Sequence, residues 1–95
     1  MQYVCVVVYT DCAITPDSNG HVDIPSSWTE INANAFYQCT SLASITIPDS
    51  VTSIGDNAFG YCTSLASVTI GDNVTSINEY TFDRCSSLTS IDRSA

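Results

Sequence analysis

Residues 47–69 read Ile-Pro-Asp-Ser-Val-Thr-Ser-Ile-Gly-Asp-Asn-Ala-Phe-Gly-Tyr-Cys-Thr-Ser-Leu-Ala-Ser-Val-Thr, and this stretch decides the fold because it recurs along the chain. Three cysteines, Cys39, Cys62 and Cys85, mark its period of 23 residues. The same spacing links five apolar columns: Ile24/Ile47/Ile70, Ile31/Ile54/Ile77, Phe36/Phe59/Phe82, Leu42/Leu65/Leu88 and Ile45/Val68/Ile91. A fixed period of this length is the signature of a solenoid, in which each repeat forms one rung.

Each rung contains two local patterns. The triplet 68–70 alternates between apolar and polar residues, which predicts a short half-buried strand, and a second short strand is expected around 52–54. Phe59 and Cys62 lie three residues apart, which indicates one turn of 3₁₀- or α-helix within 56–62. One rung cannot bury its own apolar edge, so stacking at the strand spacing of ~4.8 Å turns each column into a ladder that forms the core.

The first 23 residues repeat only in part. Segment 21–25 matches the strand segment 44–48 of the next rung, and 16–20 is a turn signal between two apolar runs. These features predict a hairpin-like cap that combines Tyr3–Tyr9 with a strand at 22–24. The expected organisation is a single domain with a cap at 1–23 and repeats at 24–46, 47–69 and 70–95.

The run from Leu42 to Cys62 resembles the BspA-like leucine-rich repeat, also called the Treponema-type repeat. The matching pattern is Leu42-x-x-Ile45-x-Ile47-Pro48-x-Ser50-Val51-Thr52-Ser53-Ile54-Gly55-x-x-Ala58-Phe59-x-x-Cys62, and the likeness extends over about Val22–Asp92. Departures are Gly71 for the proline, Asn32 and Asn78 for the glycine, Thr81 for the alanine, and Trp28 for the valine. Trp28 is expected to pack beneath the N-terminal cap.

The resemblance implies a leucine-rich-repeat solenoid, with short parallel β-strands and short 3₁₀ or α turns on the other side. Members of the family are typically binding and adhesion modules, often at cell surfaces and in longer arrays. The family has no shared catalytic residues, so the resemblance assigns no active site.

Charge excludes several classes of function. The net charge is −8, and Arg84 and Arg93 are the only basic residues apart from one histidine. A nucleic-acid binder needs cations to displace counterions from phosphates, so nucleic acid is excluded as a partner. An anionic membrane surface is disfavoured for the same reason. No apolar stretch approaches the ~20 residues of a membrane span, so membrane insertion is not expected.

The cysteines and the N-terminus bear on location. The apolar run 4–9 is too short for a signal-peptide core, and no Lys or Arg precedes it. Neighbouring ladder thiols have parallel Cβ vectors, so Cys39, Cys62 and Cys85 are predicted to be free core thiols. A Cys5–Cys12 disulfide remains open. Together these points favour a cytoplasmic location, or a fragment whose export signal lies elsewhere.

Metal and cofactor sites are not expected. A zinc site needs four converging ligands, and a linear column of cysteines with one histidine does not supply them. Two acidic pairs stack in register, Asp49 with Asp72 and Asp56 with Glu79. They are predicted to be solvated turns, with a calcium site as the alternative.

The family resemblance implies that the concave positions of the strands form the ligand face: Ser44, Thr46, Ser67 and Thr69. His21 lies beside the serine column, and a Ser-His-Asp site can be imagined there. No nucleophile-elbow motif is present, so the protein is predicted not to be an enzyme. Threonines in register also resemble ice-binding surfaces, but Asp92 interrupts their column, and ice binding is kept as a minority hypothesis.

The C-terminal rung is the expected interface. The chain ends at 93–95, where a fourth rung would begin, so the third rung should present its apolar edge and unpaired strand groups to solvent. The predicted interface residues are Phe82, Cys85, Leu88, Ile91 and Arg93. The favoured function is a non-catalytic protein-interaction scaffold that forms an isologous dimer end to end. The alternative is a surface adhesin or carbohydrate-binding fragment of a longer array.

Overall fold

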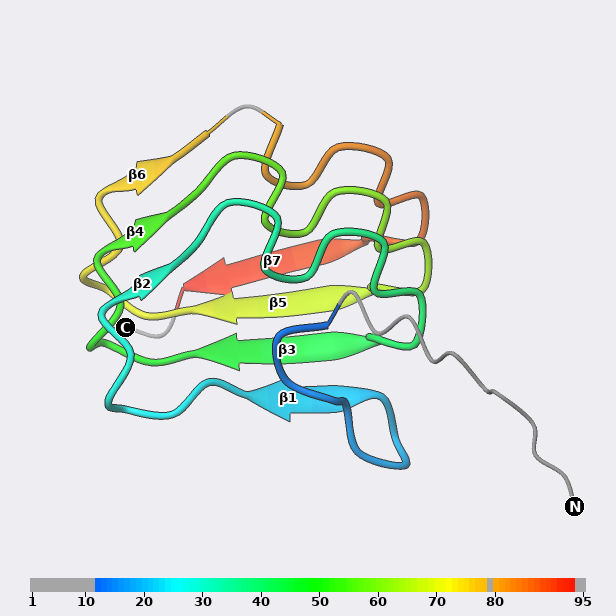
Figure 1. Ribbon diagram of the computed structural model, residues 1–95, viewed down its shortest axis with the longest axis horizontal. Helices are drawn as coiled ribbons and strands as arrows, with labels where there is room; N and C mark the ends of the chain where they lie inside the picture. Colours follow the sequence, from blue (N-terminus) through cyan, green and yellow to red (C-terminus); the bar gives the residue numbers. More distant parts are fainter. Residues whose placement is uncertain (1–11, 79, 94–95) are drawn as a thin grey trace, which may run out of the picture.

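The computed structural model describes residues 12–78 and 80–93, in which about three similar rungs stack into a parallel β-solenoid (Figure 1). One parallel sheet contains β1 (His21–Asp23), β3 (Ser44–Ile47), β5 (Ser67–Ile70) and β7 (Ser90–Arg93). The other contains β2 (Glu30–Ile31), β4 (Ser53–Ile54) and β6 (Ser76–Ile77). The leucine-rich-repeat solenoid expected from the repeat is therefore confirmed, and so is the second short strand.

The 23-residue period of the sequence sets the register in which neighbouring strands pair, because paired residues are one period apart. Strand β3 pairs with β5 so that Thr46 faces Thr69, and β4 pairs with β6 so that Ile54 faces Ile77. Side chains of β3 alternate between half-buried and buried positions. Because a slip of one residue would expose every buried side chain, the apolar columns hold the rungs in this register.

The segment between the two sheets of a rung is a run of hydrogen-bonded turns. In the second rung the N–H groups of Ala58, Gly60 and Cys62 each donate to the carbonyl three residues earlier, the pattern of 3₁₀ structure. Left-handed residues at Asn57 (φ 57°) and Tyr61 (φ 60°) interrupt this pattern, so these turns do not join into a helix. The rung therefore bends around its core within a few residues.

One left-handed position offers a stabilising substitution. Gln38 has a φ of 61°, its side chain is exposed, and it makes no side-chain hydrogen bond within the described residues. Left-handed backbone costs an L-residue roughly 1–2 kcal/mol, whereas glycine adopts it freely. We expect Gln38→Gly to raise the free energy of unfolding by about 1 kcal/mol, measured by urea unfolding. Gln38→Ala, which keeps a Cβ, should bring no gain; an equal gain in both variants would contradict this explanation.

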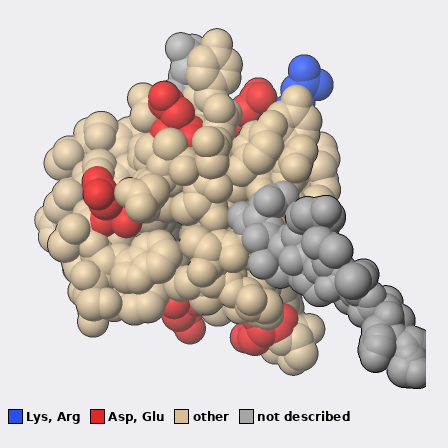
Figure 2. Space-filling model, in the orientation of Figure 1, with Lys and Arg blue, Asp and Glu red and all other residues tan. Residues whose placement is uncertain are grey.

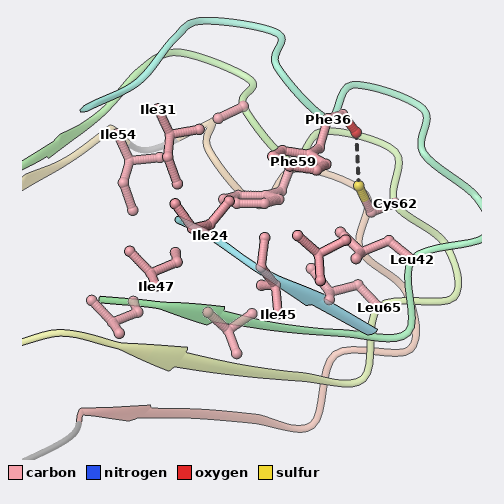
Figure 3. Packing of buried hydrophobic residues seen from close by; sticks show 14 of the residues in the cluster. Ile24, Ile31, Phe36, Leu42, Ile45, Ile47, Ile54, Phe59, Cys62 and Leu65 are labelled. Carbon is pink, nitrogen blue, oxygen red and sulfur yellow. Dashed lines mark hydrogen bonds between the residues drawn. The ribbon is translucent and has the colours of Figure 1, made fainter. Parts of the chain in front are cut away.

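The core is a set of ladders that run through the rungs. Phe36, Phe59 and Phe82 stack with ring centroids 5.3 and 5.4 Å apart. Figure 3 shows the first two of these rings lying between isoleucines from the two sheets. Seventeen apolar side chains in all are buried in the described part of the chain, so most of the fold's apolar burial lies in this one core.

The N-terminal segment continues the rungs as a half-rung at residues 13–23. Ala13 N–H donates to the Ala35 carbonyl, with the same spacing by which Phe36 N–H donates to Ala58. At the other end of this half-rung, Ala43 N–H donates to the carbonyl of Gly20, as Ala66 N–H does to that of Ala43. The repeat's backbone pattern thus starts before residue 24.

The half-rung covers the core of the first rung with smaller or polar residues. Ala13 stands one period before Phe36, and Asn19 one period before Leu42. These replacements suit an outer layer that faces solvent on one side, which is typical of terminal repeats. The Tyr3–Tyr9 strand of the predicted hairpin lies outside the described residues. Trp28 is half-buried and packs against the core.

Candidate functional site

The outer face of the third rung, here called the C-terminal face, exposes side chains that are buried in the rung before it. Ile77 is 40% exposed and Ile91 is 48% exposed, whereas their partners Ile54 and Val68 are 2% and 1% exposed. The same rung also holds Tyr80, which is 56% exposed. The difference arises because nothing in the described part of the chain covers this face.

The C-terminal face also presents unused backbone groups. In the turn region the N–H of Phe59 donates to the Thr81 carbonyl of the next rung, but within the described residues the N–H of Phe82 has no backbone partner. On the opposite side, Thr75 N–H donates to the Thr52 carbonyl, and the Thr75 carbonyl accepts no backbone hydrogen bond from a described residue. The C-terminal face therefore presents the same kinds of backbone donor and acceptor that bond one rung to the next inside the solenoid.

Four of the five residues predicted to form the interface, Phe82, Cys85, Leu88 and Ile91, lie together in the third rung. Phe82, Cys85 and Leu88 are half-buried against the core, and Ile91 is exposed. Arg93 is the last residue of β7, and its side chain lies outside the described part. The prediction that they bind a second chain is untested by this arrangement.

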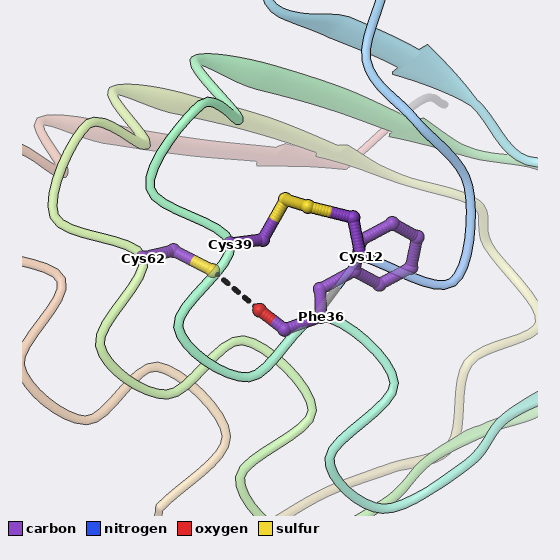
Figure 4. Close-up of a disulfide and its surroundings, with 4 residues drawn as sticks. All are labelled: Cys12, Phe36, Cys39 and Cys62. Atoms are coloured by element: carbon purple, nitrogen blue, oxygen red, sulfur yellow. Dashed lines mark hydrogen bonds between the residues drawn. A yellow bond between two sulfur atoms is a disulfide. The ribbon is translucent and has the colours of Figure 1, made fainter. Parts of the chain in front are cut away.

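The N-terminal end is closed by a disulfide between Cys12 and Cys39 (Figure 4). The prediction that Cys39 is a free thiol is therefore wrong, and Cys12 is not available to pair with Cys5. The half-rung lays Cys12 over the first rung with a Cα–Cα distance of 5.2 Å, within the range that a disulfide can bridge. The predicted absence of pairing between neighbouring ladder members holds, because Cys62 and Cys85 are free.

The two free thiols are embedded in the rungs. Cys62 Sγ donates to the Phe36 carbonyl and Cys85 Sγ to the Phe59 carbonyl, each at 3.0 Å. Burial, with a smaller effect of the neighbouring Cys85, raises the pKa of the Cys62 thiol to about 12. Burial also raises the pKa of the Cys85 thiol. Because the thiolate is the reactive form, Cys62 is protected from exchange with the disulfide one rung away.

The expected ligand face is present as two columns of hydroxyls. Ser44 pairs with Ser67, and Thr46 with Thr69, and all four side chains are half-buried on the outer side of the four-stranded sheet. His21 stands at the edge of this face, on β1, in the column of Ser44.

His21 connects three polar side chains on this face. Its Nδ1 lies 2.6 Å from Ser44 Oγ, and its Nε2 lies 2.9 Å from Asp23 Oδ1 and 3.4 Å from Thr46 Oγ1. The preceding turn positions the ring, because the backbone N–H of His21 and that of Asn19 bond to the Asp17 carboxylate. These two hydrogen bonds, that of His21 first, hold the pKa of the Asp17 carboxyl below its usual value.

Two features of these sites were missed from the sequence. Cys12 does not share the 23-residue spacing of Cys39, Cys62 and Cys85, so its pairing with Cys39 left no periodic signal. Asp23 was not associated with His21, although the two alternate on one strand and so share a face, which could have been recognised.

The side seen in Figure 2 carries scattered acidic groups on a mainly uncharged surface. The described residues form no pocket, and they hold no group of three or more His, Cys, Asp or Glu side chains placed for a metal ion. The described elements are all strands, and the described residues contain no helix that could cross a bilayer.

The fold and the ladders define a parallel solenoid of leucine-rich-repeat type, built from regular stacked rungs. The family model described as "BspA type Leucine rich repeat region (6 copies)" matches residues 11–95. The chain belongs to this BspA-type leucine-rich repeat family, as the sequence pattern indicated.

Other comparisons add little beyond the family. No curated protein matches the chain. Among solved structures, it is similar to a leucine-rich cell surface protein from Faecalibacterium prausnitzii, with 24% identity and a TM-score of 0.41. The match covers 85% of this chain and 34% of that one, so the chain spans about a third of that protein's length.

Proposed function

We propose that this protein is an interaction scaffold that binds protein through its C-terminal face, and that its partner is a second copy of the same face. The observation that carries the proposal is the difference between the two ends of the solenoid. The N-terminal end is covered by a half-rung with small and polar residues, whereas the C-terminal end keeps Phe82, Leu88 and Ile91 at core positions.

The backbone supports an interface between strands. Strand β7 pairs with β5 along one edge, and its other edge has no partner strand within the described residues. An open strand edge beside exposed apolar side chains favours pairing with another strand. Two C-terminal faces related by a twofold axis would bury Ile77 and Ile91 of both copies and satisfy the unused backbone groups.

Light scattering after gel filtration tests this proposal. The 10.2 kDa chain should elute with twice its mass at high concentration and dissociate on dilution. Ile91→Asp should weaken self-association at least about tenfold, because it places a charge at the centre of an apolar contact. Its matched control is Thr63→Asp, an exposed position of the second rung that should leave association unchanged.

Two outcomes would overturn self-association. One is a monomer at every concentration, and the other is a dimer that Ile91→Asp and Thr63→Asp weaken equally. In the second case the contact would lie elsewhere on the molecule.

A surface module that binds carbohydrate or adheres to a cell is the second candidate. The Cys12–Cys39 disulfide supports this candidate, because disulfides persist mainly in oxidising compartments such as the cell surface and not in the cytoplasm. Its ligand face would be the hydroxyl columns that contain Ser44 and Thr69. A persistent monomer that binds a glycan, and loses that binding with Thr69→Val, is the result expected for this candidate.

A further inference from the structure

The corner of the ligand face at His21 contains a nucleophile, a base and an acid in hydrogen-bond contact. Ser44 Oγ lies 2.6 Å from one ring nitrogen of His21, and Asp23 Oδ1 lies 2.9 Å from the other. The distance to Ser44 is short for a bond between nitrogen and oxygen. The three residues come from neighbouring strands, β1 and β3, whose parallel register places His21 directly opposite Ser44.

The pairing of the ring nitrogens determines what the corner can do. When Nε2 carries the proton and donates it to Asp23, Nδ1 is an acceptor for the hydroxyl proton of Ser44. A serine hydroxyl that donates to an imidazole held by a carboxylate is the arrangement of an activated nucleophile. The ring nitrogens have exchanged partners relative to the usual triad, but either nitrogen can take a proton.

We propose that Ser44 is a reactive serine that accepts the acyl group of small activated esters. As the bond from Ser44 Oγ to the carbonyl carbon forms, the hydroxyl proton passes to His21 Nδ1. The ester C–O bond then breaks, and the alcohol leaves with that proton. Water hydrolyses the acyl-serine in a second step with His21 again as the base.

Asp23 is a positioning residue in this scheme. Its carboxylate holds Nε2–H and stabilises the imidazolium that forms in each step, as the carboxylate of a triad does. Its side chain is 78% exposed, so its effect should be smaller than that of a buried carboxylate. The described residues form no pocket, which limits the substrates to small esters without bulky recognition groups.

The repeat supplies an internal control for the reactivity of Ser44. Ser67 occupies the same column one rung along, with the same strand position and the same half-buried environment. It has no histidine within hydrogen-bond contact among the described residues. Any difference between the two serines therefore reports on His21 and not on exposure or strand geometry.

The test is labelling of the 95-residue chain with a fluorophosphonate probe, with the labelled serine located by peptide mass spectrometry. We expect Ser44 to be labelled at least ~10-fold faster than Ser67, which is below the usual gain from a general base because the corner is open to water. His21→Ala should reduce labelling of Ser44 to the rate of Ser67, and added imidazole should restore part of it. Asp23→Asn should reduce the rate less than His21→Ala does.

Restoration by imidazole separates a chemical role of His21 from a structural one, because a displaced strand would not recover reactivity. Thermal unfolding of His21→Ala checks that the rungs remain folded. The proposal is overturned if Ser44 and Ser67 label at equal rates in the parent chain, or if His21→Ala labels Ser44 as fast as the parent. Neither result depends on whether the chain self-associates.

Discussion

Phe59→Ala is expected to lower the free energy of unfolding by about 3–5 kcal/mol. The Phe59 ring is fully buried, and it stacks on Phe36 at 5.3 Å and on Phe82 at 5.4 Å. Truncation removes both stacking contacts and leaves a cavity in the middle of the ladder, where the flanking rungs cannot collapse without losing their strand register. Urea unfolding followed by far-ultraviolet circular dichroism measures the loss.

Phe82→Ala is the matched control for this prediction. The Phe82 ring belongs to the same ladder, but it is only half-buried and has one stacking partner in the described part of the chain. In a monomer, Phe82→Ala should lower the free energy of unfolding clearly less than Phe59→Ala does. Equal losses in the two variants would show that position in the ladder does not govern stability, and that the rungs do not share one continuous core.

Cys12→Ser is expected to lower the free energy of unfolding by about 3–4 kcal/mol, the loop-entropy value for a disulfide that spans 27 residues. The bond joins the start of the half-rung to the first rung, and without it the half-rung is held by its backbone hydrogen bonds, the His21–Ser44 contact and the packing of Ile14 and Val22 against the core. Thermal or urea unfolding with and without a reductant measures the effect.

The reductant distinguishes the disulfide from the packing of a single sulfur atom. The parent chain in reductant should become about as unstable as Cys12→Ser, and Cys12→Ser should itself no longer respond to reductant. Cys85→Ser, which removes a free thiol, should keep the full response. A parent chain whose unfolding is indifferent to reductant would show that Cys12 and Cys39 are not joined.

Much of the fold could be predicted from the sequence because the apolar columns of the repeat coincide with the core. Phe36, Phe59 and Phe82 recur every 23 residues, and in the structure each 23-residue step leads to the same position in the next rung, where the rings stack. The strand at 68–70 followed from alternation, and a second strand was expected around 52–54; both lie within one residue of the observed bounds of β5 and β4. At these positions the local sequence pattern favours the same strands that the stacking of the rungs requires, which is why such short strands could be predicted correctly.

The half-rung was harder to predict because it repeats the backbone hydrogen bonds of a rung but not its apolar side chains. Ala13 and Gly20 continue the hydrogen bonds of the rungs, but the side chains that mark a rung are replaced by smaller or polar ones. A terminal layer that faces solvent has no need of the apolar columns, so the apolar period disappears where the structure still repeats. The Cys12–Cys39 contact depends on this half-rung and was hidden with it.

The contacts around His21 lie between these two cases. The column that contains His21 and Ser44 could be predicted from the period, since it needs only the strand register. The approach of Asp23 to the ring depends on a rotamer choice at the edge of a sheet, and periodicity does not determine it. The candidate face was therefore predictable as a set of columns, while its one reactive corner was not.

The disulfide also decides how the molecule would respond to being pulled. The hydrogen bonds between rungs run along the solenoid axis, so tension on the two ends of the chain opens them one rung at a time. Force that enters at Cys12 passes directly to Cys39 through the covalent bond, and the chain between them carries no load. The half-rung and most of the first rung would stay folded while the later rungs unravel, and reduction of one bond would remove that mechanical protection.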